Sequence, residues 1–208
     1  DYGWLHQQGR NDALPIPGPY TDFLASLART HKIWISAGCL ERDGEGTYNS
    51  AVMLDRAGEI VHKHRKIRTL PNLTQHIYDA GPADQALTVE TEFGRIGLTI
   101  CADNFDLTIP LRAAGAGAWL LIAPHGFAAP IPEMEKNARE YAEHIRKVAT
   151  TTGMWVAAAN VALARVKGGE WKDQMHCGCS TVVRPDGSVA ALGEFKRPGV
   201  IVCDIPPA

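Results

Sequence analysis

The chain has 208 residues, of which 45% are hydrophobic and 21% charged, and its formal net charge is −2. These values are ordinary for one soluble globular domain with a sizeable core, which we expect to span residues 1–208. No block of Lys and Arg indicates a nucleic-acid-binding surface. The longest apolar runs, residues 118–124 and 154–164, are too short to span a bilayer.

The cysteines and the first residues bear on the compartment and on what precedes the chain. Five cysteines are an odd number at low density, which favours free thiols in a reducing compartment such as the cytoplasm. No segment resembles a secretory signal. The chain begins at Asp1 without an initiator methionine, and residues 1–20 are predicted to form a long loop. We therefore expect further residues in front of Asp1.

The pattern of apolar residues predicts helices and strands in alternation along the chain. A helix is predicted from Tyr20 to Lys32, with Thr21 as its cap, and another at 107–118. A long amphipathic helix is predicted at 133–152. The predicted strands cover 33–40, 47–55, 59–66, a pair within 86–101, 119–124, 154–160, 179–184, 188–192 and 200–205. Continuous apolar strands such as 119–124 indicate a sheet buried on both faces, and hence a layered α/β domain.

Cys101 stands where one predicted strand ends, in the segment GLTICADNFD. A nucleophile at such a junction is held rigidly by the sheet, and free N–H groups at the following helix start could bind an oxyanion. Cysteine is also among the most buried residue types, so these residues alone favour a buried core residue over a nucleophile.

The segment HKHRKIRTLP, residues 62–71, carries several cations after another strand. Strand alternation predicts that His62, His64 and Lys66 point to one side. The segment could be a solvated edge strand protected by its charges. Alternatively, one lysine turns inward beside a thiol, where an ammonium group would favour the thiolate.

Together these two segments closely resemble the nitrilase (carbon–nitrogen hydrolase) superfamily. His64-Arg65-Lys66 matches the family's (H/Y)-R-K segment, and the segment from Gly97 to Asp103 matches its G-x-x-I-C-x-D segment. The resemblance covers essentially all of residues 20–205, including a Y-N-x-A strand before the lysine and a P-x-G turn near the end.

The resemblance implies a four-layer α-β-β-α sandwich and a Glu-Lys-Cys triad. In it, Cys101 would attack a small-molecule amide or carbamoyl-amide, and Lys66 with the N–H of Ala102 would bind the oxyanion. It also implies a homodimer or higher homo-oligomer, across faces that include the helix after the cysteine. No cofactor or metal is implied, because thiol hydrolysis of an amide needs only water.

The sequence departs from the family where the glutamates are expected. Residues 1–40 contain no glutamate, and Glu41 comes too late, so we interpret it as an ordinary strand-end charge. We therefore expect that this chain lacks the N-terminal strand-helix-strand and its general base. A second glutamate after the lysine is also missing, and His76 and Asp79 occupy its neighbourhood.

Residues after the nucleophile give the substrate hints. Cys101-Ala102-Asp103 is closer to the C-Y-D of amidases than to the C-W-E of nitrilases, so an amide is expected. Asn104 and His125 match positions that line the pocket in relatives and are candidate substrate contacts.

Four alternatives stay open from sequence. Cys101 and His125 could form a Cys-His hydrolase. A metal could be bound by His176, Cys177 and Cys179 together with His62 or His64, although their C-x-C spacing is unlike structural zinc sites. The chain could also be a catalytically inactive scaffold of the same fold, or an enzyme acting on a nitrile.

Overall fold

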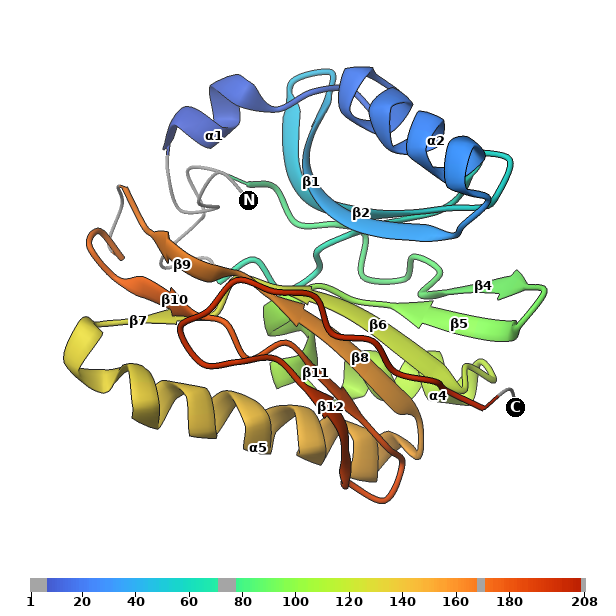
Figure 1. Cartoon of the computed structure of the whole chain (residues 1–208). Helices are drawn as coiled ribbons and strands as arrows, with labels where there is room; N and C mark the ends of the chain where they lie inside the picture. Colours follow the sequence, from blue (N-terminus) through green and yellow to red (C-terminus); the bar gives the residue numbers. More distant parts are fainter. Residues whose placement is uncertain (1–6, 71–77, 168–170, 207–208) are drawn as a thin grey trace.

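The computed structural model describes residues 7–70, 78–167 and 171–206, which form four layers (Figure 1). Helix α2 (Pro19–His31) covers a small sheet on its outer face. The opposite face of that sheet packs on a larger sheet, whose far side is covered by α4 (Thr108–Gly115) and α5 (Met134–Thr152). The predicted α-β-β-α layering is therefore confirmed.

The small sheet is antiparallel and contains β1 (Ile35–Asp43), β2 (Gly46–Leu54) and β3 (Ile60–Arg65) in that order. Helix α2 packs on it through Leu24 and Ala25. The helix begins after Gly18, and Thr21 is its third residue rather than its cap, which corrects the prediction. The Thr21 hydroxyl accepts a hydrogen bond from the Gly18 N–H at 2.9 Å, so it still satisfies a donor at the helix start.

The larger sheet has six strands in the order β12-β11-β8-β6-β5-β4. Their bounds are β4 (Thr88–Thr91), β5 (Gly94–Leu98), β6 (Leu120–His125), β8 (Trp155–Asn160), β11 (Thr181–Val183) and β12 (Val189–Leu192). Strands β5, β6 and β8 are parallel, and the remaining pairs are antiparallel. Parallel neighbours need crossover connections, and α4 and α5 provide them between β5, β6 and β8.

Smaller elements complete the described part of the chain. A three-stranded sheet is built from β7 (Ala128–Ala129), β10 (Met175–Cys177) and β9 (Ala162–Arg165), and the short helices are α1 (Gln7–Asp12), η1 (Cys101–Phe105) and η2 (Ile131–Glu133). Helix α1 contradicts the loop predicted for the first residues. Residues 200–205 were predicted as a strand, but they lie outside any strand.

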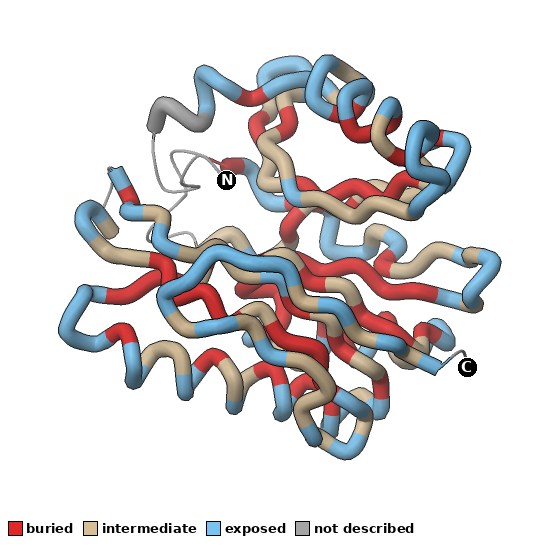
Figure 2. Tube along the Cα trace, viewed as in Figure 1, coloured by how far each residue is buried: buried red, intermediate tan, exposed pale blue. Residues whose placement is uncertain are grey.

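Buried residues follow the two interfaces of the larger sheet (Figure 2). Helix α5 buries one stripe that includes Tyr141, Ile145 and Val148, so its predicted amphipathic character is confirmed. Between the two sheets, Met53 of β2 packs with Ile96 and Leu120 of the larger sheet. In the described ranges, no helix combines the length and the apolar character needed to cross a membrane.

Candidate active site

Three parallel strands bring polar side chains to one edge of the larger sheet. Strand β5 ends at Leu98 and leads through two residues to Cys101, β6 ends at His125, and β8 ends at Asn160. His125 and Asn160 are register partners. The carboxyl ends of parallel strands are where open α/β sheets bind ligands. The topology therefore places Cys101 in the expected position for a site.

A cavity of about 450 Å³ opens at this edge, between the two sheets. The larger sheet contributes the ends of β5, β6 and β8, and the small sheet contributes β1, β2 and the residue after β3. The lining residues are Asp12, Leu14, Tyr20, Ser36, Ala37, Gly38, Cys39, Leu40, Asn49, Lys66, Ile100, Cys101, Pro124, His125, Gly126, Ala159, Asn160 and Val161. Most of these side chains are apolar, and a few polar groups converge among them, as is usual for small-molecule sites.

Cys101 is 6% exposed and is the first residue of the 3-10 helix η1. Its φ angle is +44°, a left-handed conformation that non-glycine residues rarely adopt. Such strain is concentrated at functional sites, where the surrounding structure has to enforce it. The Cys101 conformation therefore supports the nucleophile interpretation over that of a core cysteine.

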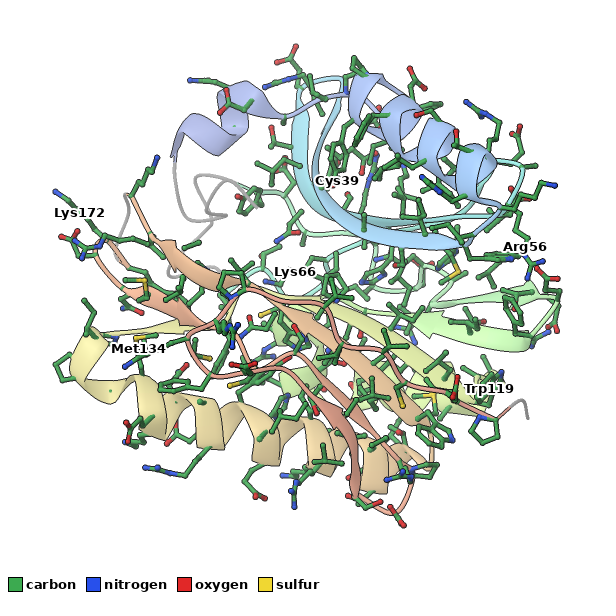
Figure 3. The ribbon with its side chains drawn as sticks, in the orientation of Figure 1. Cys39, Arg56, Lys66, Trp119, Met134 and Lys172 are labelled. Atoms are coloured by element: carbon green, nitrogen blue, oxygen red, sulfur yellow. The ribbon has the colours of Figure 1, made fainter. Side chains whose placement is uncertain are left out.

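Lys66 is 2% exposed and lies between the two sheets (Figure 3). Its backbone is held on both sides, because its N–H donates to the Asn49 carbonyl and its own carbonyl accepts from the Gly81 N–H, each at 2.8 Å. His64, on the same face of the chain, is fully buried. The prediction that Lys66 turns inward is therefore confirmed, and the edge-strand alternative is wrong for this residue.

Glu41 is not the strand-end charge that we predicted. It lies within β1 at 1% exposure and accepts hydrogen bonds from Ser50, Lys63 and Arg65. Burial alone would raise the pKa of Glu41, but these donors outweigh burial and lower it from 4.5 to about 2. Because Lys63 and Arg65 alternate with His64 and Lys66, this network lies on the face of β3 opposite to Lys66.

His125 lines the cavity and is 5% exposed. Its Nδ1 lies 2.9 Å from the Ala123 carbonyl, so that nitrogen carries the proton and donates. Burial lowers the pKa of His125 to about 4, and the imidazole is therefore neutral at pH 7.

The other two predicted residues lie behind the cavity wall. Ala102 is fully buried as the second residue of η1, where helix geometry leaves N–H groups without intrahelical acceptors. Asn104 is also buried, and its Oδ1 accepts from the Thr99 hydroxyl at 2.9 Å. Asn104 is not among the residues that line the cavity, so the structure does not bring it to the predicted substrate position.

Sequence reasoning missed several cavity residues, of which Asn49, Asn160 and Cys39 carry polar or nucleophilic groups. Asn160 ends the apolar strand β8, so a polar residue at a strand end was the available signal. The Asn160 Oδ1 accepts a hydrogen bond from the Phe127 N–H at 2.9 Å, and the Asn160 Nδ2 donates one to the Gly178 carbonyl at 2.7 Å. It therefore shapes the wall and fixes the loop that follows β6.

The remaining sequence candidates that the structure describes are not among the residues that line the cavity. Asp79 accepts from the Thr47 N–H at 2.9 Å, and His76 lies outside the described residues. His176 contacts the Ala164 carbonyl through Nδ1 at 2.7 Å. Across the described residues, no cluster of three or more His, Cys, Asp or Glu side chains is arranged to hold a metal ion.

A four-layer α-β-β-α sandwich with a buried cysteine and lysine in one inter-sheet cavity defines the class as a nitrilase-type α/β sandwich. Comparison with protein families agrees with this class. The chain belongs to the carbon-nitrogen hydrolase family, whose model matches residues 1–208.

Individual relatives are distant but cover most of the chain. Nitrilase 3 of an unknown prokaryotic organism is 26% identical over 98% of this chain and 63% of its own length. A bifunctional nitrilase/nitrile hydratase of Nicotiana tabacum is 28% identical over 93% of this chain and 56% of its own length. The chain thus spans somewhat more than half the length of these curated relatives.

Solved structures share the fold. The carbon-nitrogen hydrolase of Helicobacter pylori G27 has a TM-score of 0.74 at 24% identity, covering 83% of this chain and 62% of its own. A mutant of the amidase from Nesterenkonia sp. AN1 has a TM-score of 0.75 at 20% identity, covering 89% of this chain and 66% of its own. In that mutant, the acetamide moiety of fluoroacetamide is covalently added at the active-site cysteine.

Proposed function

We propose that this cavity hydrolyses the carbon–nitrogen bond of a small amide through a thioester on Cys101. The observation that carries the proposal is the convergence of Cys101 and Lys66 in the wall of one cavity. They lie 35 positions apart in the sequence and come from different sheets, yet both are almost completely buried. Charged side chains such as lysine are rarely buried without a specific purpose.

In the proposed reaction, Cys101 Sγ forms a bond to the carbonyl carbon of the amide. The oxyanion that develops accepts hydrogen bonds from the Lys66 ammonium and the Ala102 N–H. The C–N bond then breaks, and the nitrogen leaves as ammonia or an amine after gaining a proton. Water attacks the thioester, releases the carboxylic acid and returns the thiol.

The amide preference has two supports. The cavity volume of about 450 Å³ suits a small molecule, and its walls are largely apolar. In the Nesterenkonia amidase, which shares the fold, an acetamide moiety is attached to the active-site cysteine. An acetamide moiety keeps its C–N bond, so this adduct supports access of a small amide to that cysteine and is not itself the thioester that we assign to Cys101.

The proton-transfer group is the incomplete part of the site. Among the described lining residues, the only carboxylate is Asp12, which is exposed, and none is a glutamate. His125 is a weak base at neutral pH, because its pKa is about 4, and this disfavours a Cys-His pair. We therefore propose that the 208-residue chain turns over slowly, because both formation and hydrolysis of the thioester need a proton transfer.

Intact-mass spectrometry during incubation with a short aliphatic amide such as butyramide tests this function. We expect an acyl adduct on the Cys101 peptide, with one ammonia released for each adduct that forms, and both should be abolished in Cys101→Ala. Lys66→Ala should slow acylation by about 10²–10³-fold, the usual effect of losing one oxyanion donor. Cys39→Ala, which changes another thiol of the same cavity, should react like the wild type.

Two outcomes would replace the proposal. If neither an adduct nor ammonia exceeded the Cys101→Ala background, the chain would be an inactive scaffold of this fold. If butyronitrile reacted at Cys101 and butyramide did not, the site would act on nitriles.

We also propose that the protein forms a homodimer through the face that carries α4. Leu111 of α4 and Phe105 of η1 are each 42% exposed, and exposed apolar side chains favour association. Light scattering should give twice the chain mass, and Leu111→Lys should shift it toward the monomer. An unchanged monomer mass for the wild type would rule this out.

A further inference from the structure

Asp103 is fully buried, two residues after Cys101, and its carboxylate accepts four hydrogen bonds. Each oxygen accepts two of them. Oδ1 accepts from the N–H groups of Ile67 at 3.0 Å and Arg68 at 2.8 Å, and Oδ2 accepts from the Ile100 N–H at 3.0 Å and His64 Nε2 at 2.8 Å. An ionised carboxylate offers about four lone-pair sites, so its accepting capacity is filled.

The four donors belong to the two segments that carry the proposed catalytic residues. His64, Ile67 and Arg68 surround Lys66 in the sequence, and Ile100 directly precedes Cys101. One side chain therefore joins the end of β3 to the turn after β5. Asp103 itself is not among the residues that line the cavity, so it does not face a substrate there.

We propose that Asp103 is a positioning residue that holds Lys66 and Cys101 at the separation the reaction needs. This inference rests on the proposed function. Lys66 already has its own N–H and carbonyl paired with Asn49 and Gly81, which fixes its distance from β2. Asp103 supplies the complementary connection, across the gap between the two sheets.

In this proposal Asp103 fixes the backbone of the two segments that carry Lys66 and Cys101, and it does not contact the amide. Misplacement of catalytic groups by about 1 Å can cost about 10²-fold in rate. An amide at position 103 keeps the shape of the carboxylate but replaces one acceptor oxygen by an NH₂ group. That NH₂ would face two N–H donors, and the connection to one of the segments would open.

The test is a double-mutant cycle on the rate of iodoacetamide alkylation at Cys101, followed by mass spectrometry at pH 7.5. In the wild type, Lys66→Ala should slow alkylation by about 10²-fold. Asp103→Asn alone should slow it by about 10- to 100-fold. In the Asp103→Asn background, Lys66→Ala should slow it by less than about 3-fold, because Lys66 is no longer in place.

A merely structural role for Asp103 would give a different pattern. The Lys66→Ala effect would then be the same size in both backgrounds, and this additive result would overturn the proposal. If Lys66→Ala had no effect in the wild type, the proposed function would fail together with the positioning role. If Lys66→Ala slowed alkylation equally in the wild type and in Asp103→Asn, the positioning role would be wrong and the proposed function would stand.

Variants at His64 keep the test valid should Asp103→Asn not fold. His64→Leu removes one of the four donors to Asp103. His64→Gln places an amide N–H near the position of the His64 Nε2 and can replace that donor. We expect His64→Leu to slow Cys101 alkylation and to weaken the Lys66→Ala effect, and His64→Gln to restore both. Thr181→Val is the matched control: it removes a buried polar group bonded to Ala191, away from the cavity, and should change neither rate. Equal rates for His64→Leu and the wild type would contradict the proposal.

Discussion

Glu41 and Arg65 are joined by two hydrogen bonds, of 2.9 and 2.7 Å, on the face of the small sheet opposite to Lys66. The Arg65 guanidinium also lies 3.9 Å from the centre of the Tyr48 ring. The residue that immediately precedes Lys66 is thus held by a buried carboxylate and an aromatic ring. This arrangement makes the end of β3 rigid where the lysine enters the cavity.

Glu41→Gln should lower the free energy of unfolding by about 3 kcal/mol at pH 7, since it removes the carboxylate that pairs with Lys63 and leaves Arg65 paired with Asp43 alone. The folded pKa of Glu41 is lowered from 4.5 to about 2, so its stabilisation is complete above pH 4.5 and is lost as the pH falls toward 2. Urea unfolding at pH 7 and pH 4 should therefore show a smaller difference between variant and wild type at pH 4. Glu143→Gln, at an exposed position of α5, is the control and should have no effect. A difference that grew on acidification would contradict this account.

Acidification should also destabilise the protein through one buried and two half-buried histidines. Burial lowers the pKa of His62, His125 and His144 from 6.5 to about 4. The unfolded chain therefore binds more protons than the folded one between about pH 6.5 and 4, and stability falls as the pH falls through that window. Each such histidine contributes about 1.4 kcal/mol per pH unit.

Urea midpoints between pH 7.5 and 5 measure this slope. His144→Gln should reduce the dependence of stability on pH by about 1.4 kcal/mol per pH unit. His31→Gln, at an exposed position, should leave this dependence unchanged. An identical slope in the wild type and His144→Gln would contradict this account, because it would mean that His144 binds protons equally well in the folded and unfolded states.

Gly81→Ala should slow the proposed acylation more than any other glycine-to-alanine change near the site. A Cβ at Gly81 would collide with the Arg65 carbonyl oxygen and lie 2.7 Å from the Arg65 Cβ, so the backbone before Lys66 would have to move. We expect a loss of about 10²-fold in the acylation rate of Cys101. Gly115→Ala is the control, because nothing lies within 4 Å of its added Cβ and alanine favours the helix. Equal rates for Gly81→Ala and the wild type would mean that the end of β3 tolerates displacement.

Cys101 and Cys39 line the same cavity, so a reagent that reaches one should reach the other. Burial, with Glu41 nearby, raises the pKa of Cys39 to about 12, and its thiolate is therefore scarce at pH 7.5. We expect iodoacetamide to modify Cys101 at least 10²-fold faster than Cys39, measured by peptide mass spectrometry. Comparable rates would indicate that the accessibility of the thiol, and not its activation within the site, determines how fast Cys101 is alkylated.

Local patterns predicted the elements with a strong period. Helix 133–152 was predicted within one residue of α5, because the buried apolar residues of this helix form one stripe, namely Met134, Tyr141, Ile145, Val148 and Ala149. Helix α1 was missed, since its sequence QQGRND has no apolar face to signal a helix. Residues 200–205 have alternating burial like a strand, but strand assignment also needs a pairing partner, which a local pattern does not reveal.

In the candidate site, too, residues in local sequence motifs could be predicted, whereas contacts between distant strands could not. Cys101 and Lys66 were predicted to share a site from two local motifs, and both line the cavity. Glu41 was misjudged because its partners, Ser50, Lys63 and Arg65, depend on the register of three strands. Asn104 was expected in the cavity from its nearness to Cys101, yet the turn of η1 directs its side chain to Thr99.

The parallel arrangement of β5, β6 and β8 separates what builds the domain from what shapes its cavity. Their interior residues, such as Leu98, Leu121 and Val156, are fully buried in the core, whereas the cavity receives the residues at or just beyond the strand ends. Exchanging side chains such as Val161 or Leu14 would thus alter the volume offered to a ligand while leaving the sheet untouched. The same scaffold can in this way be refitted for differently shaped molecules with few changes, which makes these rim positions natural starting points for directed evolution.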